Sequence, residues 1–230
     1  MNQKQLLEKE LVGSKAAELI EHNMTVGLGT GSTVYYMIKK LAERVKEGLA
    51  VTGVSTSRST TELALSLGIN VVDINEVEEI DICIDGADEV DKDLCAIKGG
   101  GGALLREKIV ASHSKKVVLI IDSTKYVKRL GAFPLPVEIV PYAYKHTLKR
   151  FIKEGFTPKI RENNGKLYET DGGNYILDLY LNCIEEPAFL SKTINNIPGV
   201  VENGLFIDLA DEVYLADGED VRMIKKAGGN

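Results

Sequence analysis

The chain has 230 residues, of which 44% are apolar and 27% are charged. This length and composition suit one sizeable α/β domain, or a main domain with a smaller one, and exclude a disordered chain. The 34 acidic residues outnumber the 28 basic ones, so the formal charge of -6 argues against general nucleic-acid binding. A small anionic substrate held by local donors remains compatible with this charge.

The N-terminal residues lack the basic region and the unbroken apolar stretch of a signal peptide. No later segment approaches the roughly 20 apolar residues of a membrane span, so we expect a cytoplasmic protein. The three cysteines and three histidines are scattered without metal-ligand spacing. We therefore expect free thiols, no metal and no cofactor.

The first half of the chain alternates helical and extended patterns. A helix is expected over 7–20, a strand over 24–29 that ends in glycines, and then a helix with apolar residues at three- and four-residue spacing. Further strands are expected over 50–55, 69–74, 79–85 and 115–122, and further helices over 59–67 and 103–112. This alternation predicts a Rossmann-like, mostly parallel sheet with helices on both faces and a ligand site at the carboxyl ends of its strands.

From Pro134 the order of patterns becomes β-α-β-β-α-β, which is typical of a small α+β ferredoxin-like unit. Strands are expected over 136–140, 157–161, 174–181 and 200–206, and helices over 144–155 and 187–197. We predict an inserted small domain over 131–205 and a catalytic domain made of 1–130 and 206–230. Residues 211–226 are expected to return to the first sheet as a hairpin around Asp217-Gly218, and 227–230 to be frayed.

Two loops rich in small and hydroxyl residues follow predicted strands. Residues 27–33, Gly-Leu-Gly-Thr-Gly-Ser-Thr, could present free amides to an anion, or form a tight turn in which Ser32 or Thr33 caps a helix. Ser32 and Val34 occupy positions where a dinucleotide fingerprint needs glycine, and the Gly-Lys-Ser/Thr ending of a Walker A loop is missing. The loop over 55–60 is open to the same two interpretations, a ligand contact or a helix cap.

Carboxylates crowd the end of the predicted strand over 79–85, where Asp85, Asp88, Glu89 and Asp91 follow one another closely. Such a cluster binds sugar hydroxyls, binds a metal, holds a lysine, or is a solvated acidic turn.

A lysine, four glycines and a helix start come next, from Lys98 to about Lys108. Four consecutive glycines cost backbone entropy, and close approach to a ligand would justify that cost. Glu107 lies near the helix start, off the apolar face, and can project toward Lys98; the alternative is an exposed helical glutamate.

Together, the motifs GLGTGSTV, IDGADEVD, IKGGGGALLREKI and DSTK, in this order, resemble the type A ribose-5-phosphate isomerase family. The segments FPLPVEIVP, TDGGNYILD and IPGVVENGLF also resemble that family, so the resemblance covers nearly the whole chain. Its one mild departure is Gly102, where alanine is common.

The resemblance implies an aldose-ketose isomerase of the non-oxidative pentose phosphate pathway that works through an enediol and without a metal. Glu107 matches the glutamate that transfers the proton. The implied substrate-binding residues are Thr30, Gly31, Ser32, Thr33, Asp85, Gly86, Ala87, Asp88, Lys98, Gly99, Gly100, Gly101 and Lys125, with Ser32 and Thr33 near the phosphate. The resemblance also implies a homo-oligomer, a dimer or tetramer.

The chemistry of the reaction adds two hypotheses about individual residues. Lys98 and backbone amides are candidates to stabilise the negative oxygen of the intermediate. Opening of the furanose ring needs an acid-base partner, for which Asp85 is the first choice and Asp88 the second. The alternatives to an isomerase are a non-catalytic sugar-phosphate sensor, for which a DNA-binding segment is missing, and an acyl-CoA transferase relative.

Overall fold

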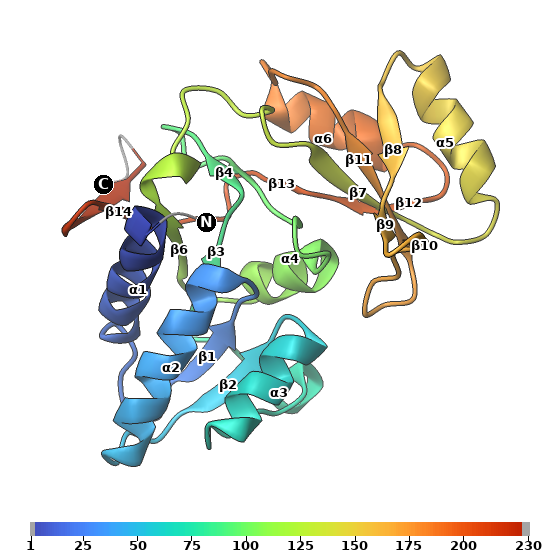
Figure 1. Cartoon of the computed structure of the whole chain (residues 1–230). Helices are drawn as coiled ribbons and strands as arrows, with labels where there is room; N and C mark the ends of the chain where they lie inside the picture. The colour runs from blue at the N-terminus through green and yellow to red at the C-terminus, as the bar shows by residue number, and fades with distance from the viewer. Residues whose placement is uncertain (1–2, 227–230) are drawn as a thin grey trace.

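The structure is a computed structural model that describes residues 3–226, and its main sheet has six strands (Figure 1). The strand order is β15-β14-β6-β3-β1-β2, and all neighbours run parallel except the hairpin pair β14 and β15. The strands are β1 (Thr25–Leu28), β2 (Thr52–Ser55), β3 (Ile82–Gly86), β6 (Val117–Asp122), β14 (Glu212–Asp217) and β15 (Asp220–Lys225).

Helices cover both faces of this sheet, because the side chains of its buried strands alternate between two cores. Val118 and Ile120 of β6 pack in one core with α1, α2 and α3, while Val117, Leu119 and Ile121 pack in the other with α4. The helices are α1 (Gln3–Ala17), α2 (Ser32–Lys46), α3 (Arg58–Ser66) and α4 (Leu104–Ser112), with 3-10 turns η1 (Ile74–Glu76) and η2 (Ser123–Lys125). The predicted Rossmann-like sheet is confirmed.

A second, four-stranded sheet has the order β12-β7-β11-β8 with antiparallel neighbours, as a ferredoxin-like unit requires (Figure 1). Its elements are β7 (Leu135–Ile139), α5 (Tyr144–Lys153), β8 (Pro158–Ile160), β11 (Tyr175–Leu179), α6 (Pro187–Asn195) and β12 (Val200–Asn203). Both helices pack on this sheet around a third core that contains Phe151 and Ile194. The division of the chain into domains at 131 and 205 stays a prediction.

Two predicted strands differ from the structure. Residues 69–74 form only an isolated bridge between Val71 and Gly53, because Asp73 accepts a hydrogen bond from the Asn75 amide and starts the turn η1. The strand predicted over 200–206 divides at Gly204 into β12 and β13 (Leu205–Phe206). A Cβ on Gly204 would lie 2.3 Å from the Lys98 carbonyl oxygen, so only glycine lets the chain cross there.

Two small sheets were not predicted. Strand β13 joins β5 (Ala96–Ile97) and β4 (Glu89–Val90) in a three-stranded sheet, and β9 (Glu162–Asn163) pairs with β10 (Lys166–Leu167) in a hairpin. The C-terminal hairpin β14-β15 returns to the main sheet as predicted. The frayed end predicted for 227–230 lies outside the described residues.

Within residues 3–226, none of the helices combines the length and apolar character needed to span a membrane.

Candidate active site

A cavity of about 130 Å³, open to solvent, lies where the carboxyl ends of β1, β3 and β6 meet the start of α2 and the glycine loop, which we define as residues 99–102. Its lining residues are Lys9, Thr30, Gly31, Ser32, Thr33, Gly86, Ala87, Asp88, Lys98, Gly99, Gly100, Gly101, Glu107 and Lys125. Ligands of parallel α/β sheets generally bind at the carboxyl ends of the strands, and this cavity lies there. Every residue predicted to contact substrate lines this cavity except Asp85, which lies buried behind it.

Lys98 is the centre of a buried ionic cluster. Its Nζ lies 3.0 Å from Asp85 Oδ2 and 3.2 Å from Glu107 Oε1, and all three residues are at most 4% exposed. Backbone contacts fix Lys98 at the end of β5, since its amide donates to the Gly204 carbonyl. Among the alternatives for the acidic strand end, the structure therefore shows a carboxylate that holds a lysine.

Asp85 supports this cluster. Its Oδ1 accepts hydrogen bonds from the amides of Thr30 (3.0 Å) and Gly86 (2.7 Å). Burial raises the pKa of Asp85, and the neighbouring Lys98 charge opposes that rise. With both oxygens engaged on the protein side, Asp85 orients Lys98 and the loop that begins at Thr30.

Glu107 is buried at the start of α4, so the alternative of an exposed helical glutamate is wrong. Its Oε1 pairs with Lys98, whereas Oε2 has no hydrogen-bond partner among the described residues. Burial raises the pKa of Glu107 from 4.5 to about 8; Lys98 opposes this rise, and the nearby Asp85 charge adds to it. A buried carboxyl group with one free oxygen beside a cavity is suited to accept and return a proton.

The charge balance of the cluster explains this shift. Burial alone would lower the pKa of Lys98, but the carboxylates of Asp85 and Glu107 raise it above its ordinary value, so Lys98 stays cationic. One cation neutralises one carboxylate, and the second carboxylate holds its proton more strongly in a site that excludes water.

The start of α2 is open to an anion. Gly31 is the N-cap residue, with φ 123°, and no side chain caps the helix, so neither Ser32 nor Thr33 serves as the cap. The first backbone bond of the helix joins the Tyr35 amide to the Gly31 carbonyl, which leaves the amides before it for a ligand. Backbone amides, two hydroxyls and the partial positive charge of the helix end converge there.

Lys9 of α1 is a site residue that the sequence reasoning missed. Its Nζ donates to Ser32 Oγ (2.8 Å) and lies 3.8 Å from Asp122 Oδ2, although α1 is far from the other motifs in sequence. Nothing near Lys9 in the sequence marks it, because only the packing of α1 against α2 brings it to the cavity. Lys125 also lines the cavity, which therefore has two cationic side chains besides Lys98.

The loop over 55–60 is structural. Ser57 caps α3 by accepting a hydrogen bond from the Thr60 amide, and the hydroxyls of Thr56, Ser57 and Thr60 surround the Thr30 hydroxyl. This network holds the residue before Gly31 in place from the outside. The helix-cap interpretation is therefore confirmed.

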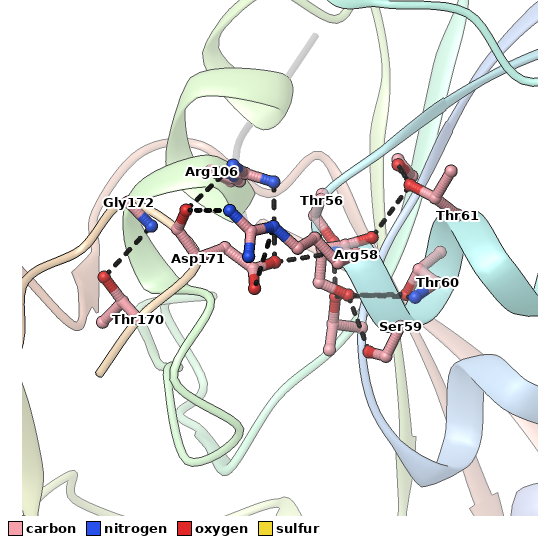
Figure 2. A network of polar contacts seen from close by, with 12 residues as sticks. Thr56, Arg58, Ser59, Thr60, Thr61, Arg106, Thr170, Asp171 and Gly172 are labelled. Carbon is pink, nitrogen blue, oxygen red and sulfur yellow. Dashed lines mark hydrogen bonds and ion pairs between the residues drawn. The ribbon is translucent and has the colours of Figure 1, made fainter. Parts of the chain in front are cut away.

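The turn before β11 contacts the main sheet unit at the start of α3, next to the loop over 55–60. Asp171 lies between Arg58 and Arg106 in Figure 2, and its carboxylate accepts from the Arg58 amide at 2.7 Å. Arg106 precedes Glu107 on α4, so Asp171 links the second sheet unit to the helix that carries the buried glutamate.

In the part of the chain that the structure describes, no group of three His, Cys, Asp or Glu side chains has a geometry that could hold a metal ion. The thiols of Cys83, Cys95 and Cys183 are free.

Comparison with known proteins identifies the family. The model of the family described as ribose 5-phosphate isomerase A (phosphoriboisomerase A) matches residues 52–220. The chain belongs to this family. The ribose-5-phosphate isomerase A of Streptococcus suis (strain 05ZYH33) is 49% identical over 219 residues, which cover 95% of this chain and 98% of the relative. That of Listeria monocytogenes (strain EGD-e) is 46% identical over 221 residues, with 95% and 99% covered.

Solved structures agree with the fold. The ribose 5-phosphate isomerase A of Methanocaldococcus jannaschii superposes with a TM-score of 0.90 at 41% identity and covers 95% of this chain and 98% of its own. A D-ribose-5-phosphate isomerase solved in complex with phospho-erythronic acid has a TM-score of 0.92 at 36% identity, with 98% and 100% covered. The family resemblance drawn from the sequence motifs is thus confirmed for ribose 5-phosphate isomerase A, and the roles of individual residues are proposals.

Proposed function

We propose that this protein interconverts D-ribose 5-phosphate and D-ribulose 5-phosphate in the non-oxidative pentose phosphate pathway. The observation that carries the proposal is Glu107, a buried carboxyl group with one free oxygen beside the cavity, held against a lysine. Family membership names the substrate class, and the solved relative with phospho-erythronic acid supports a sugar phosphate as the ligand.

The phosphate group of the substrate would bind at the start of α2. Backbone amides and the hydroxyls of Ser32 and Thr33 would donate to its oxygens, while Lys9 and Lys125 neutralise its charge. This anchor places the aldehyde end of a five-carbon chain toward Lys98 and Glu107, on the other side of the cavity.

The proton transfer then needs one base. The Glu107 carboxylate removes the proton from C2, and the C–H electrons form a C1=C2 double bond while negative charge moves onto the C1 oxygen. Glu107 then returns the proton to C1, and the proton of the C2 hydroxyl passes to the C1 oxygen, so that the ketose results. Lys98 and the amides of the glycine loop stabilise the oxygen charge.

For ring opening, the geometry favours Asp88 over the first choice, Asp85. Asp88 lines the cavity and uses Oδ2 to accept from the Gly100 amide at 2.8 Å, whereas Asp85 is not among the lining residues. A Cβ at Gly100 would lie 2.6 Å from Asp88 Oδ1, so glycine is required for this contact. Asp88 is therefore our candidate for the acid-base group that opens the furanose.

The test measures formation of ribulose 5-phosphate from ribose 5-phosphate by the purified protein and by Asp88→Asn. We expect the wild type to turn over and the variant to lose about 10²-fold in rate with this cyclic substrate. With D-erythrose 4-phosphate, which cannot close a furanose, the variant should lose much less. An inactive wild type would refute the function, and equal losses with both sugars would refute the role of Asp88 alone.

The pH dependence of the reaction should reflect Glu107. Burial raises the pKa of Glu107 to about 8, and only the ionised carboxylate accepts the C2 proton. We expect kcat/KM to rise about tenfold per pH unit well below that pKa and to level off above it. A pH series from 5 to 9.5 checks this, and a flat profile from pH 5 upward would contradict it.

The cellular location and the assembly of the protein are the remaining parts of the proposal. We place the enzyme in the cytoplasm and propose a homo-oligomer, a dimer or tetramer, on the family resemblance; light scattering that gives a mass near 25.1 kDa would contradict the assembly. No specific observation on the described residues supports a sugar-phosphate sensor or an acyl-CoA transferase relative, and the family match favours the isomerase.

A further inference from the structure

The carbonyl groups of the glycine loop are bound from the side of the second sheet. Arg161 Nη1 donates to the carbonyls of Gly99 (2.9 Å) and Gly100 (3.1 Å), and the Tyr168 hydroxyl donates to the carbonyl of Gly101 (3.0 Å). Three consecutive carbonyls are therefore held by two side chains that follow β8 and β10, outside the cavity lining.

These two side chains are themselves fixed. Asp178 of β11 accepts hydrogen bonds from Nε and Nη2 of Arg161, a bidentate pair in which both side chains are less than one-fifth exposed. The guanidinium carbon of Arg161 also lies 5.8 Å from the centre of the Tyr168 ring. Because Nε and Nη2 are used by Asp178, Nη1 is directed at the loop.

We call Arg161 and Tyr168, with the carbonyls they bind, the clamp. Because the clamp fixes these carbonyls, it also fixes the direction of the amide that follows each of them. In a trans peptide the carbonyl of one residue and the amide of the next point in opposite directions, and the described residues contain no cis peptide. With the Gly99 carbonyl on Arg161, the Gly100 amide points to the cavity side, where it meets Asp88 at 2.8 Å. With the Gly100 carbonyl on Arg161, the Gly101 amide points the same way and has no partner among the described residues.

Gly102 shows that the loop and Tyr168 fit together. Its φ is +81°, and a Cβ there would lie 2.2 Å from the Tyr168 hydroxyl oxygen. Glycine at position 102 therefore makes room for the tyrosine that holds the preceding carbonyl.

We propose that Arg161 and Tyr168 are positioning residues of the isomerase: they orient the peptides of the glycine loop so that the Gly101 amide donates to the oxygen that becomes negative in the enediolate. The inference rests on the proposed function. Neither side chain contacts the substrate, and Asp178 acts one step further back by holding Arg161. The second sheet thus contributes to catalysis through the loop it binds.

Three substitutions test this inference, two at side chains that bind the loop and one at the carboxylate that holds Arg161. Tyr168→Phe removes one hydrogen bond and keeps the ring against Gly102; Arg161→Lys keeps the charge near Asp178 but not the forked contacts; Asp178→Asn loosens Arg161 without touching the loop. We expect kcat to fall about tenfold for Tyr168→Phe and about 10²-fold for Arg161→Lys, with Asp178→Asn between them and KM within about threefold of wild type.

Binding of phospho-erythronic acid, measured by calorimetry, is the second readout. Its carboxylate carries negative charge where the enediolate would, so its Kd should rise in each variant in proportion to the loss of kcat. The controls are Tyr142→Phe, at a side chain 88% exposed, and Arg150→Lys, whose partner Glu154 lies on the surface beyond α5; both should leave kcat and Kd unchanged.

An unchanged kcat in folded Arg161→Lys, or a raised KM with unchanged kcat, would overturn the inference. If the wild type failed to isomerise ribose 5-phosphate, the proposed function would fall, and the Kd series would still decide whether the clamp orients donors toward an anionic ligand. If Arg161→Lys does not fold, the kcat and Kd of Tyr168→Phe, the mildest change, decide whether the inference holds.

Discussion

Replacing Glu107 by glutamine is expected to lower kcat about 10³- to 10⁴-fold while KM stays within a few-fold of wild type. The amide has the shape of the carboxyl group but cannot accept the C2 proton, and general-base catalysis is worth about this factor. A coupled assay of ribose 5-phosphate conversion measures the loss. Glu43→Gln on the exposed side of α2 is the matched control and should be fully active. Equal rates for Glu107→Gln and wild type would refute the proton-transfer role.

The same variant should change how stability depends on pH. Burial raises the folded-state pKa of Glu107 to about 8, above its ordinary 4.5, so the folded protein binds this proton more tightly than the unfolded chain. Its contribution to stability is therefore complete below pH 4.5 and is lost as the pH rises through 8. Glu107→Gln should lack this decline. Urea unfolding of wild type and variant at pH 5 and pH 8.5 measures it, and an equal change of unfolding free energy with pH in the two proteins would contradict the coupling of Glu107 ionisation to folding.

Replacing Lys98 by methionine should cost both stability and activity. The substitution leaves Asp85 and Glu107 buried without their cation, and breaking a buried ion pair from one side typically costs about 3–5 kcal/mol. Loss of its charge beside the developing oxygen anion should lower kcat by at least about 10²-fold.

The loss of stability should be larger at pH 8 than at pH 6, because the two carboxyl groups are harder to keep protonated at the higher pH. Urea unfolding of Lys98→Met at both pH values measures it, with Lys92→Met, at a side chain 77% exposed, as the control. An unfolding free energy within about 1 kcal/mol of wild type at both pH values would contradict the ionic cluster as a unit.

Local patterns predicted most of the fold. The strand and helix over 24–45 were predicted from an apolar run, a glycine turn and helical spacing, and the structure places β1 and α2 there. The strand predicted over 69–74 failed because a side-chain contact of Asp73 ends the extended segment early. Hairpin β9-β10 was missed although Asn164-Gly165, both with positive φ, is the usual signal for a tight hairpin turn.

The candidate site was predictable to the extent that it is built from contiguous loops. Residues 30–33 lie just after β1 and residues 86–88 at the end of β3, and neighbouring parallel strands bring such loops to one edge of the sheet. Residues 98–101 follow β5 of the small antiparallel sheet instead, so their place beside the cavity was not predictable in this way. Residue types alone do not distinguish a loop that faces the cavity from one that supports its neighbour. The loop over 55–60 has the same residue types as 30–33, but its hydroxyls bond to Thr30 rather than face the cavity.

The sequence alone determined the type of chemistry, because spacing and residue type are local properties of the chain. It predicted Lys98, the glycine loop and Glu107 in one segment, and a turn suited to bind an anion. Tertiary structure alone decided that Glu107 is buried with a raised pKa, that Asp85 holds Lys98, and that Lys9 lies against Ser32 at the start of α2. The same holds for Arg161 and Tyr168, about 60 residues beyond the loop whose carbonyls they bind. Burial and long-range contacts depend on how distant elements pack, and no short stretch of sequence records that packing.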